Sequence, residues 1–210
     1  MEVYNNPERY APEAVASEFA RHAAWFAVSG VGAMLAFLCV PLLVPNAIVP
    51  GALALAALGF VIPFSNSGIC ITLLLTRLPY AGGWLYAADL TGAALGCLGI
   101  IFALLVVDPV SATFWLGAFS AGAGWMVVRS QGVASARRLS GVVALAMGAV
   151  AVVHTGLAVS GQSHLGVFWA KGYAQTETLF ERWNTYSRVR VRPLGESMPF
   201  GWGFTHNPDV

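Results

Sequence analysis

Five long apolar stretches alternate with short polar segments along this chain. They cover about residues 22–44, 48–76, 84–107, 110–128 and 139–159. A helix needs roughly 20 apolar residues to cross a hydrocarbon core about 30 Å thick, and these stretches are of that size. The pattern therefore predicts an all-α fold, a polytopic transmembrane helical bundle with about five spans.

Polar segments flank the predicted bundle on both sides. Residues 1–21 form a polar N-terminal segment, either an interfacial helix that begins near Pro12 or a frayed end. Its glutamates and its lack of a basic start do not fit a signal peptide. Residues 161–210 form an extramembrane tail, rich in glycine and proline and predicted to be irregular. Within it, residues 187–192 alternate as a short half-exposed strand does.

Arginines between the spans predict the orientation. Arg77 lies in the second loop, and Arg129, Arg137 and Arg138 lie in the fourth. Because cytoplasmic loops are enriched in Lys and Arg, these two loops are expected in the cytoplasm. The N-terminus is then cytoplasmic and the tail periplasmic, in a bacterial inner membrane.

Composition supports a lipid environment and excludes several function classes. The 210 residues are 57% hydrophobic and only 10% charged, too few charges to cover a soluble domain of this size. A net charge of +1, with no basic run among aromatics, gives no indication of nucleic-acid binding. Cys39, Cys70 and Cys97 lie in apolar stretches and are expected to be packing residues.

Two groups of polar residues fall at membrane depth. Ser65 and Asn66 follow Pro63, which leaves a backbone carbonyl unpaired, and they can satisfy it or bind a neighbouring helix. Asp89 lies near the start of the third span with Tyr86 beside it. Its carboxylate is either a proton or cation site, or a surface carboxylate bonded to Tyr86, Thr91 or Arg77, and the second interpretation is favoured.

Small residues four apart indicate helix packing. In lipid, apolar area gives little drive for association, so helices associate where small residues let their backbones approach. This spacing occurs in two spans, in the pairs Gly92 and Gly96, Gly117 and Ala121, and Ser120 and Gly124.

Histidines raise the question of a metal site. His22 and His154 could each ligate a metal or a chlorin magnesium, but each is alone in its span, so an interfacial histidine with a polar partner is preferred. No metal and no cofactor is predicted, while bound lipid, pigment or quinone stays open. The chain shows no nucleophile-plus-base spacing, no paired carboxylates and no phosphate loop, so it is not expected to be an enzyme.

Two stretches resemble bacterial membrane proteins in which a multi-span region is fused to a spermidine-synthase-like domain. Residues 85–97 read LYAADLTGAALGC, preceded by PFSNSG at 63–68, and residues 179–189 read LFERWNTYSRV. The resemblance implies a spermidine-synthase-like membrane region followed by the strand that leads into the synthase-like domain. That family's cofactor domain would begin after Val210, so its transfer chemistry is not carried over.

The combined expectation is a non-catalytic integral subunit that scaffolds a larger membrane complex, such as a photosynthetic or respiratory assembly. Its expected partners are the lipid bilayer and other integral subunits. The tail is expected to dock a partner through Trp183, Tyr186, Arg188 and Trp202. The alternatives are the membrane module of a split spermidine-synthase-like enzyme and, third, a small transporter or channel half-unit using Asp89, Asn66 and Ser65.

Overall fold

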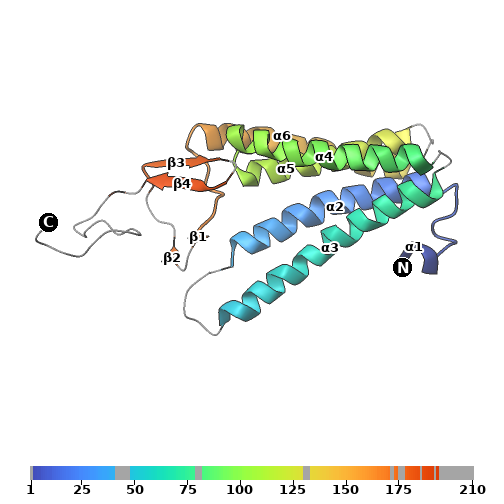
Figure 1. The fold of residues 1–210 in the computed structure, drawn as a ribbon, viewed down its shortest axis with the longest axis horizontal. Helices are drawn as coiled ribbons and strands as arrows, with labels where there is room; N and C mark the ends of the chain where they lie inside the picture. The colour runs from blue at the N-terminus through green and yellow to red at the C-terminus, as the bar shows by residue number, and fades with distance from the viewer. Residues whose placement is uncertain are drawn as a thin grey trace, which may run out of the picture.

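The fold is known from a computed structural model that describes residues 2–40, 48–78, 82–129, 133–170, 173–174, 178–184, 186–191 and 193. The helices of this part of the chain are α1 (Glu2–Asn5), α2 (Val15–Leu38), α3 (Ile48–Arg77), α4 (Gly82–Val106), α5 (Pro109–Arg129) and α6 (Ala134–Val159). The short strands are β1 (Trp169–Ala170), β2 (Tyr173–Ala174), β3 (Phe180–Trp183) and β4 (Arg188–Val191). Figure 1 shows the long helices lying lengthwise, with β3 and β4 beyond one end of the bundle.

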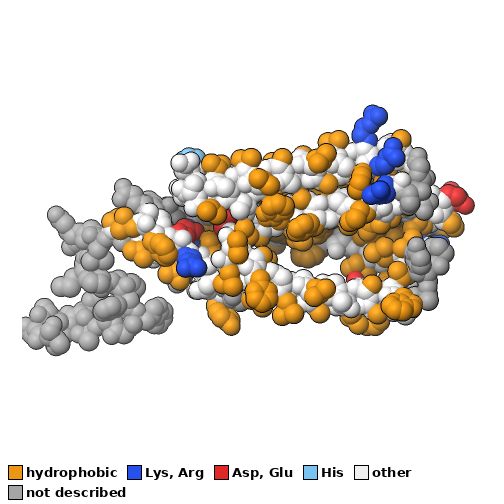
Figure 2. Space-filling view, turned by 90° about the horizontal axis from the view of Figure 1, so that it is seen from above, with side chains coloured by type: hydrophobic (Ala, Val, Ile, Leu, Met, Phe, Trp, Pro, Cys, Tyr) orange, Lys and Arg blue, Asp and Glu red, His pale blue; other side chains and the backbone are white. Residues whose placement is uncertain are grey.

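Helices α2 to α6 are each long and apolar enough to cross a membrane. This confirms the predicted all-α bundle, and the chain is an integral membrane protein. Figure 2 shows hydrophobic side chains along the length of the bundle, the surface that lipid tails require.

The first span differs most from the sequence prediction. Helix α2 begins at Val15, seven residues before the predicted start at 22, because residues 15–21 contain no helix breaker after Pro12. It ends at Leu38, and the predicted end at 44 lies outside the described residues. The segment before α2 is not a free end, since Val3 and Tyr10 are buried together with Phe19 and Leu73 in a core cluster.

Helix α2 is the centre of the bundle. It packs against α3, α5 and α6, and α5 packs in turn against α6. A second core cluster, made of Val31, Leu38, Val110, Phe114 and Ala151, lies toward the opposite end of α2 and joins it to α5 and α6. Helix α4 makes only limited contact, with α3 and α5.

Pro63 lies inside α3 without ending the helix. The nearby amide of Asn66 donates from Nδ2 to the carbonyl oxygen of Ile62, 2.9 Å away. The carbonyl that Pro63 leaves unpaired is that of Gly59, four residues earlier, so this bond is not the expected one. Asn66 instead fills its other expected role, because its Oδ1 lies 2.7 Å from His22 Nδ1 on the neighbouring helix α2.

The alternating stretch of the tail forms the predicted strand. Strands β3 and β4 pair antiparallel, with Phe180 opposite Val191 and Trp183 opposite Arg188. The Arg188 guanidinium donates to both carboxylate oxygens of Glu181, at 2.8 and 2.6 Å, and to the carbonyl of Val167 at 3.3 Å. These contacts tie the β3–β4 hairpin to the segment that follows α6.

Candidate functional site

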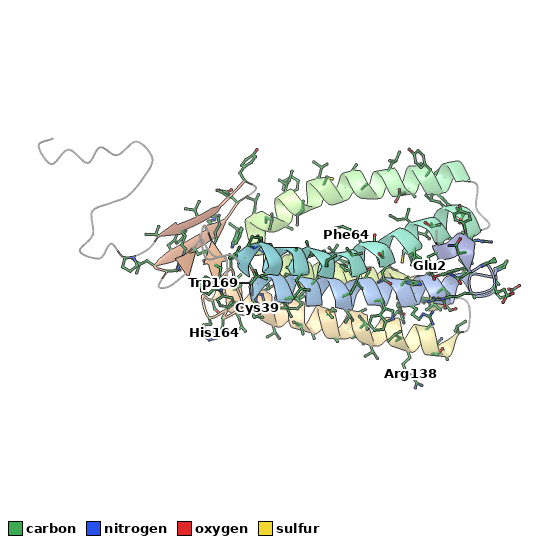
Figure 3. The ribbon with its side chains drawn as sticks, turned by 90° about the horizontal axis from the view of Figure 1, so that it is seen from below. Glu2, Cys39, Phe64, Arg138, His164 and Trp169 are labelled. Carbon is green, nitrogen blue, oxygen red and sulfur yellow. The ribbon has the colours of Figure 1, made fainter. Side chains whose placement is uncertain are left out.

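The most exposed element of the bundle is α4. None of its 25 residues is buried. Figure 3 shows this pale green helix standing apart from the other long helices along most of its length. A β-carbon added at Gly92 or at Gly96 would meet no atom within 4 Å, so the predicted packing face is open within this chain.

Asp89 lies on the same face of α4 as the two glycines. Positions 89, 92, 96, 99 and 103 recur every three or four residues, which places Asp89, Gly92, Gly96, Gly99 and Ala103 on one stripe. The Asp89 side chain is exposed, and within the described residues it has no hydrogen-bond or ion-pair partner. The expected bond to Tyr86, Thr91 or Arg77 is not made, and the Thr91 hydroxyl donates to the Ala87 carbonyl instead.

The small residues of α5 are arranged differently. Gly117, Ala121 and Gly124 are buried, and an added β-carbon at Gly124 would lie 3.0 Å from the Cα of Ala20. The hydroxyl of Ser120 donates to the Ala23 carbonyl at 3.1 Å. These residues let the backbones of α5 and α2 approach closely.

A polar cluster surrounds His22 at the end of the bundle where α2 begins. Its Nδ1 lies 2.7 Å from Oδ1 of Asn66, and its Nε2 lies 3.4 Å from the Tyr10 hydroxyl and 3.7 Å from a carboxylate oxygen of Glu18. Because the Asn66 amide nitrogen is held by Ile62, Oδ1 faces the ring, and Nδ1 is the protonated nitrogen. Burial raises the pKa of the Tyr10 phenol, while the nearby Arg9 opposes that shift.

The intramembrane polar residues do not converge on one site. Asn66 is hydrogen-bonded to His22, whereas Asp89 lies on the open face of α4. Within the described segments no hydrogen bond joins Asp89 to Asn66 or to Ser65.

A second polar cluster surrounds His154 at the other end of the bundle. The Asp108 carboxylate caps α5 by accepting from the backbone amides of Val110 and Ser111, at 3.0 and 3.4 Å. It also accepts a short hydrogen bond from the Ser111 hydroxyl. His154 lies between two serines, with Nδ1 2.8 Å from Ser111 Oγ and Nε2 3.0 Å from Ser163 Oγ.

A cavity of about 860 Å³ lies beside the His154 cluster. Its walls come from the ends of α2, α4, α5 and α6, from the segment after α6, and from β3 and β4. Apolar side chains such as Met34, Phe37 and Leu105 line one part, and the polar residues Ser163, Glu181 and Arg188 line another. Figure 3 places Cys39, His164 and Trp169 at this end of the molecule and Glu2 and Arg138 at the other.

Both histidines have the polar partners that the sequence analysis preferred. In the part of the chain that the structure describes, no three His, Cys, Asp or Glu side chains come together as a metal site would require.

The tail residues proposed for docking are only partly described. Trp183 donates from Nε1 to Glu181 at 3.1 Å, and the Arg188 guanidinium lies over its ring, 5.7 Å from the centroid. Tyr186 is 95% exposed at the turn of the hairpin. Trp202 lies outside the described residues.

Fold and contacts define a polytopic helical membrane protein in which helix α4 makes only limited contact with α3 and α5 in the described part of the chain. Comparison with known proteins adds no closer assignment, because no family model, no curated protein and no solved structure matches this sequence. The resemblance to spermidine-synthase-like membrane regions thus stays a prediction.

Sequence reasoning missed the His154 cluster because its members are far apart along the chain. Ser111 and His154 are 43 residues apart, and His154 and Ser163 are nine apart. One signal was visible in the sequence. Asp108 followed by Pro109 is a typical start of a helix, and Ser111 then lies in the first turn of that helix.

Proposed function

We propose that this chain is an integral subunit of a larger protein complex in a bacterial inner membrane. In this role it holds neighbouring subunits through the open face of α4, with its N-terminus in the cytoplasm and its tail in the periplasm. The observation that carries the proposal is a transmembrane helix of 25 residues with no buried residue and a stripe of small residues facing open space.

Small residues are a costly choice for a surface that meets only lipid. Glycine lowers helix stability by roughly 1 kcal/mol relative to alanine, and it offers lipid tails almost no contact area. The cost is offset where a second helix packs against the exposed backbone. On α5 the cost of glycine is offset by packing against α2. In the described part of this chain no helix packs against Gly92 and Gly96 on α4.

Asp89 indicates what kind of helix covers α4. A carboxylate facing lipid near the middle of a span costs roughly 2.5–3.5 kcal/mol on insertion scales, and less toward the interface. The cost falls if a neighbouring helix donates a hydrogen bond at that depth. A second copy of this chain inserts in the same orientation and would place Asp89 against Asp89. Charge complementarity therefore favours a different protein, with an Arg, Lys, His or amide side chain opposite Asp89.

Co-purification in a mild detergent tests the proposal. The tagged wild-type chain should elute with stoichiometric membrane proteins, identified by mass spectrometry. Gly96→Leu should lose them, because a leucine on the stripe separates the backbones by more than small-residue packing allows. Ala94→Leu is the matched control, since position 94 lies on the opposite side of α4, and it should retain the partners.

The contrary outcome is equally clear. A wild-type chain that elutes from native membranes as a single monodisperse monomer overturns the proposal. Equal loss of partners in Gly96→Leu and Ala94→Leu would show that the small-residue stripe is not the docking face.

A further inference from the structure

The hydrogen bonds around His154 run in one direction. The Asp108 carboxylate can only accept, so the Ser111 hydroxyl donates to it. The Ser111 oxygen is then free to accept from the nearer histidine nitrogen, Nδ1, at 2.8 Å. With its proton on Nδ1, the neutral ring has its lone pair on Nε2, which lies 3.0 Å from Ser163 Oγ.

This chain of contacts matches the functional order of an activated serine. An acid fixes the tautomer of a histidine, and the unprotonated nitrogen of that histidine accepts the proton of a serine hydroxyl. Here Ser111 joins the acid to the ring, since the direct distance from Asp108 Oδ1 to His154 Nδ1 is 3.7 Å. The Ser163 oxygen accepts from the Leu165 amide at 3.3 Å. Its single proton has two acceptors within reach, the Leu165 carbonyl at 3.1 Å and His154 Nε2 at 3.0 Å, and rotation of the hydroxyl directs that proton to the ring.

We propose that Ser163 is a nucleophile, activated by His154, that takes the acyl group from a carboxylic ester of an amphipathic, lipid-like molecule. The inference goes beyond the scaffold role and rests on different residues. The spacing of residues along the sequence did not indicate Ser163 as a nucleophile or His154 as its base.

The position of Ser163 indicates the substrate class. Ser163 and Asp108 line the cavity of about 860 Å³, whereas the His154 ring is only 5% exposed and lies behind them. Ser163 follows the last residue of α6 by four positions, which puts it near the boundary of the hydrocarbon core. The ester groups of membrane lipids lie at that boundary. The apolar cavity wall around Met34, Phe37 and Leu105 suits an acyl chain, and the charged part near the hairpin suits a polar head.

The reaction follows from these contacts. Ser163 Oγ bonds to the ester carbonyl carbon while its proton passes to His154 Nε2. The tetrahedral intermediate then breaks its bond to the leaving oxygen, which takes the proton from Nε2 and departs as an alcohol. A water molecule attacks the acyl-Ser163 ester in the same way and releases a carboxylic acid. Asp108, through Ser111, stabilises the imidazolium that forms in each half.

A fluorophosphonate probe tests the nucleophile directly on the purified full-length protein in mild detergent. Wild type should be labelled, and mass spectrometry of the labelled protein should place the adduct on Ser163. Ser163→Ala should abolish labelling. Ser160→Ala is the matched control, because the Ser160 hydroxyl is exposed and bonds only the Leu157 carbonyl among described residues, and it should label as wild type does.

The roles of His154 and Ser111 are tested by the rate of labelling and by its pH profile. His154→Gln should slow labelling by about 100-fold or more, the usual contribution of a general base. Ser111→Ala should slow it while helical content is unchanged. His154→Gln should also change the pH profile of the labelling rate, because that variant lacks the general base.

Wild-type protein that reacts no faster than Ser163→Ala, or an adduct that maps to another residue, overturns the inference. So does a labelling rate that His154→Gln leaves unchanged. None of these readouts depends on a partner subunit, so they are separate from the test of the scaffold role.

Discussion

Helices α4 and α5 carry the same small-residue signal and use it in opposite ways. On α5, Gly117 and Gly124 are buried against α2, and a β-carbon at either would contact Ala27 or Ala20. On α4, Gly92 and Gly96 would contact nothing. The difference teaches that small residues at this spacing specify close backbone approach without specifying whether the second backbone belongs to the same chain.

The polar residues of the two faces differ in the same way. Ser120 on the α5 face donates to a backbone carbonyl of α2, whereas Asp89 on the α4 face has no partner in the described segments. A face completed within the chain contributes to its folding. In the proposed scaffold role the open face of α4 contributes to assembly, so substitutions on the two faces should separate stability from partner binding.

The largest effect is expected at Gly124. Gly124→Leu places a side chain where even a β-carbon lies 3.0 Å from the Ala20 backbone, so α5 must move away from α2. We expect a loss of about 3 kcal/mol or more, at the upper end of overpacking costs. Unfolding of the purified protein by SDS in mixed micelles measures it.

Gly122→Leu is the matched control for that experiment. It makes the same chemical change two positions away on the same helix, where an added β-carbon meets nothing within 4 Å. Equal destabilisation in the two variants would show that the loss does not come from contact between position 124 and α2, because the gain in helix propensity is the same in both.

The second largest effect is expected at Asn66. Asn66→Leu leaves the Nδ1 donor of the buried His22 without its acceptor, which should cost about 1–3 kcal/mol in the same SDS unfolding experiment.

Asp89→Leu is the comparison on the open face of α4. Because the Asp89 carboxylate has no partner among the described residues, the substitution should not lower the unfolding free energy of the isolated chain. A destabilising Asp89→Leu would show that the Asp89 carboxylate has a partner within the chain.

The sequence was sufficient to predict the bundle. Apolar runs of span length have few alternatives in lipid, because backbone polar groups there must be satisfied within helices. Residues 15–21 were assigned to the polar segment before the first span. The helix expected from near Pro12 runs through them into that span as one helix, with Glu18 paired to Arg9 and Arg21.

The sequence was not sufficient to predict the polar clusters. Hydrogen bonds such as those from His22 to Asn66 and from His154 to Ser111 join positions more than 40 residues apart, and the relative rotation of two spans decides them. Hydrophobic patterning does not fix that rotation when apolar residues surround most of each helix. Nor does spacing reveal that α4 stands apart from the others.

A smaller effect of opposite sign is expected at Gly117. Its added β-carbon would lie 3.6 Å from Ala27 and from Met147, which is ordinary van der Waals contact. Gly117→Ala should therefore stabilise the isolated chain by up to about 1 kcal/mol through helix propensity. SDS unfolding that shows marked destabilisation would indicate that α2 and α5 pack closer at this point than the contacts suggest.

No loss of stability of the isolated chain is expected at Gly96, and this substitution sharpens the comparison most. Gly96→Leu should not destabilise the purified chain in SDS unfolding, because its added side chain meets open space, and helix propensity should add at most about 1 kcal/mol of stability. A stability loss approaching that of Gly124→Leu would mean that α4 packs against its own chain in solution. Stability unchanged together with lost co-purification is the one combination that requires a helix from another protein, because only a partner absent from the isolated chain makes Gly96 sensitive to size.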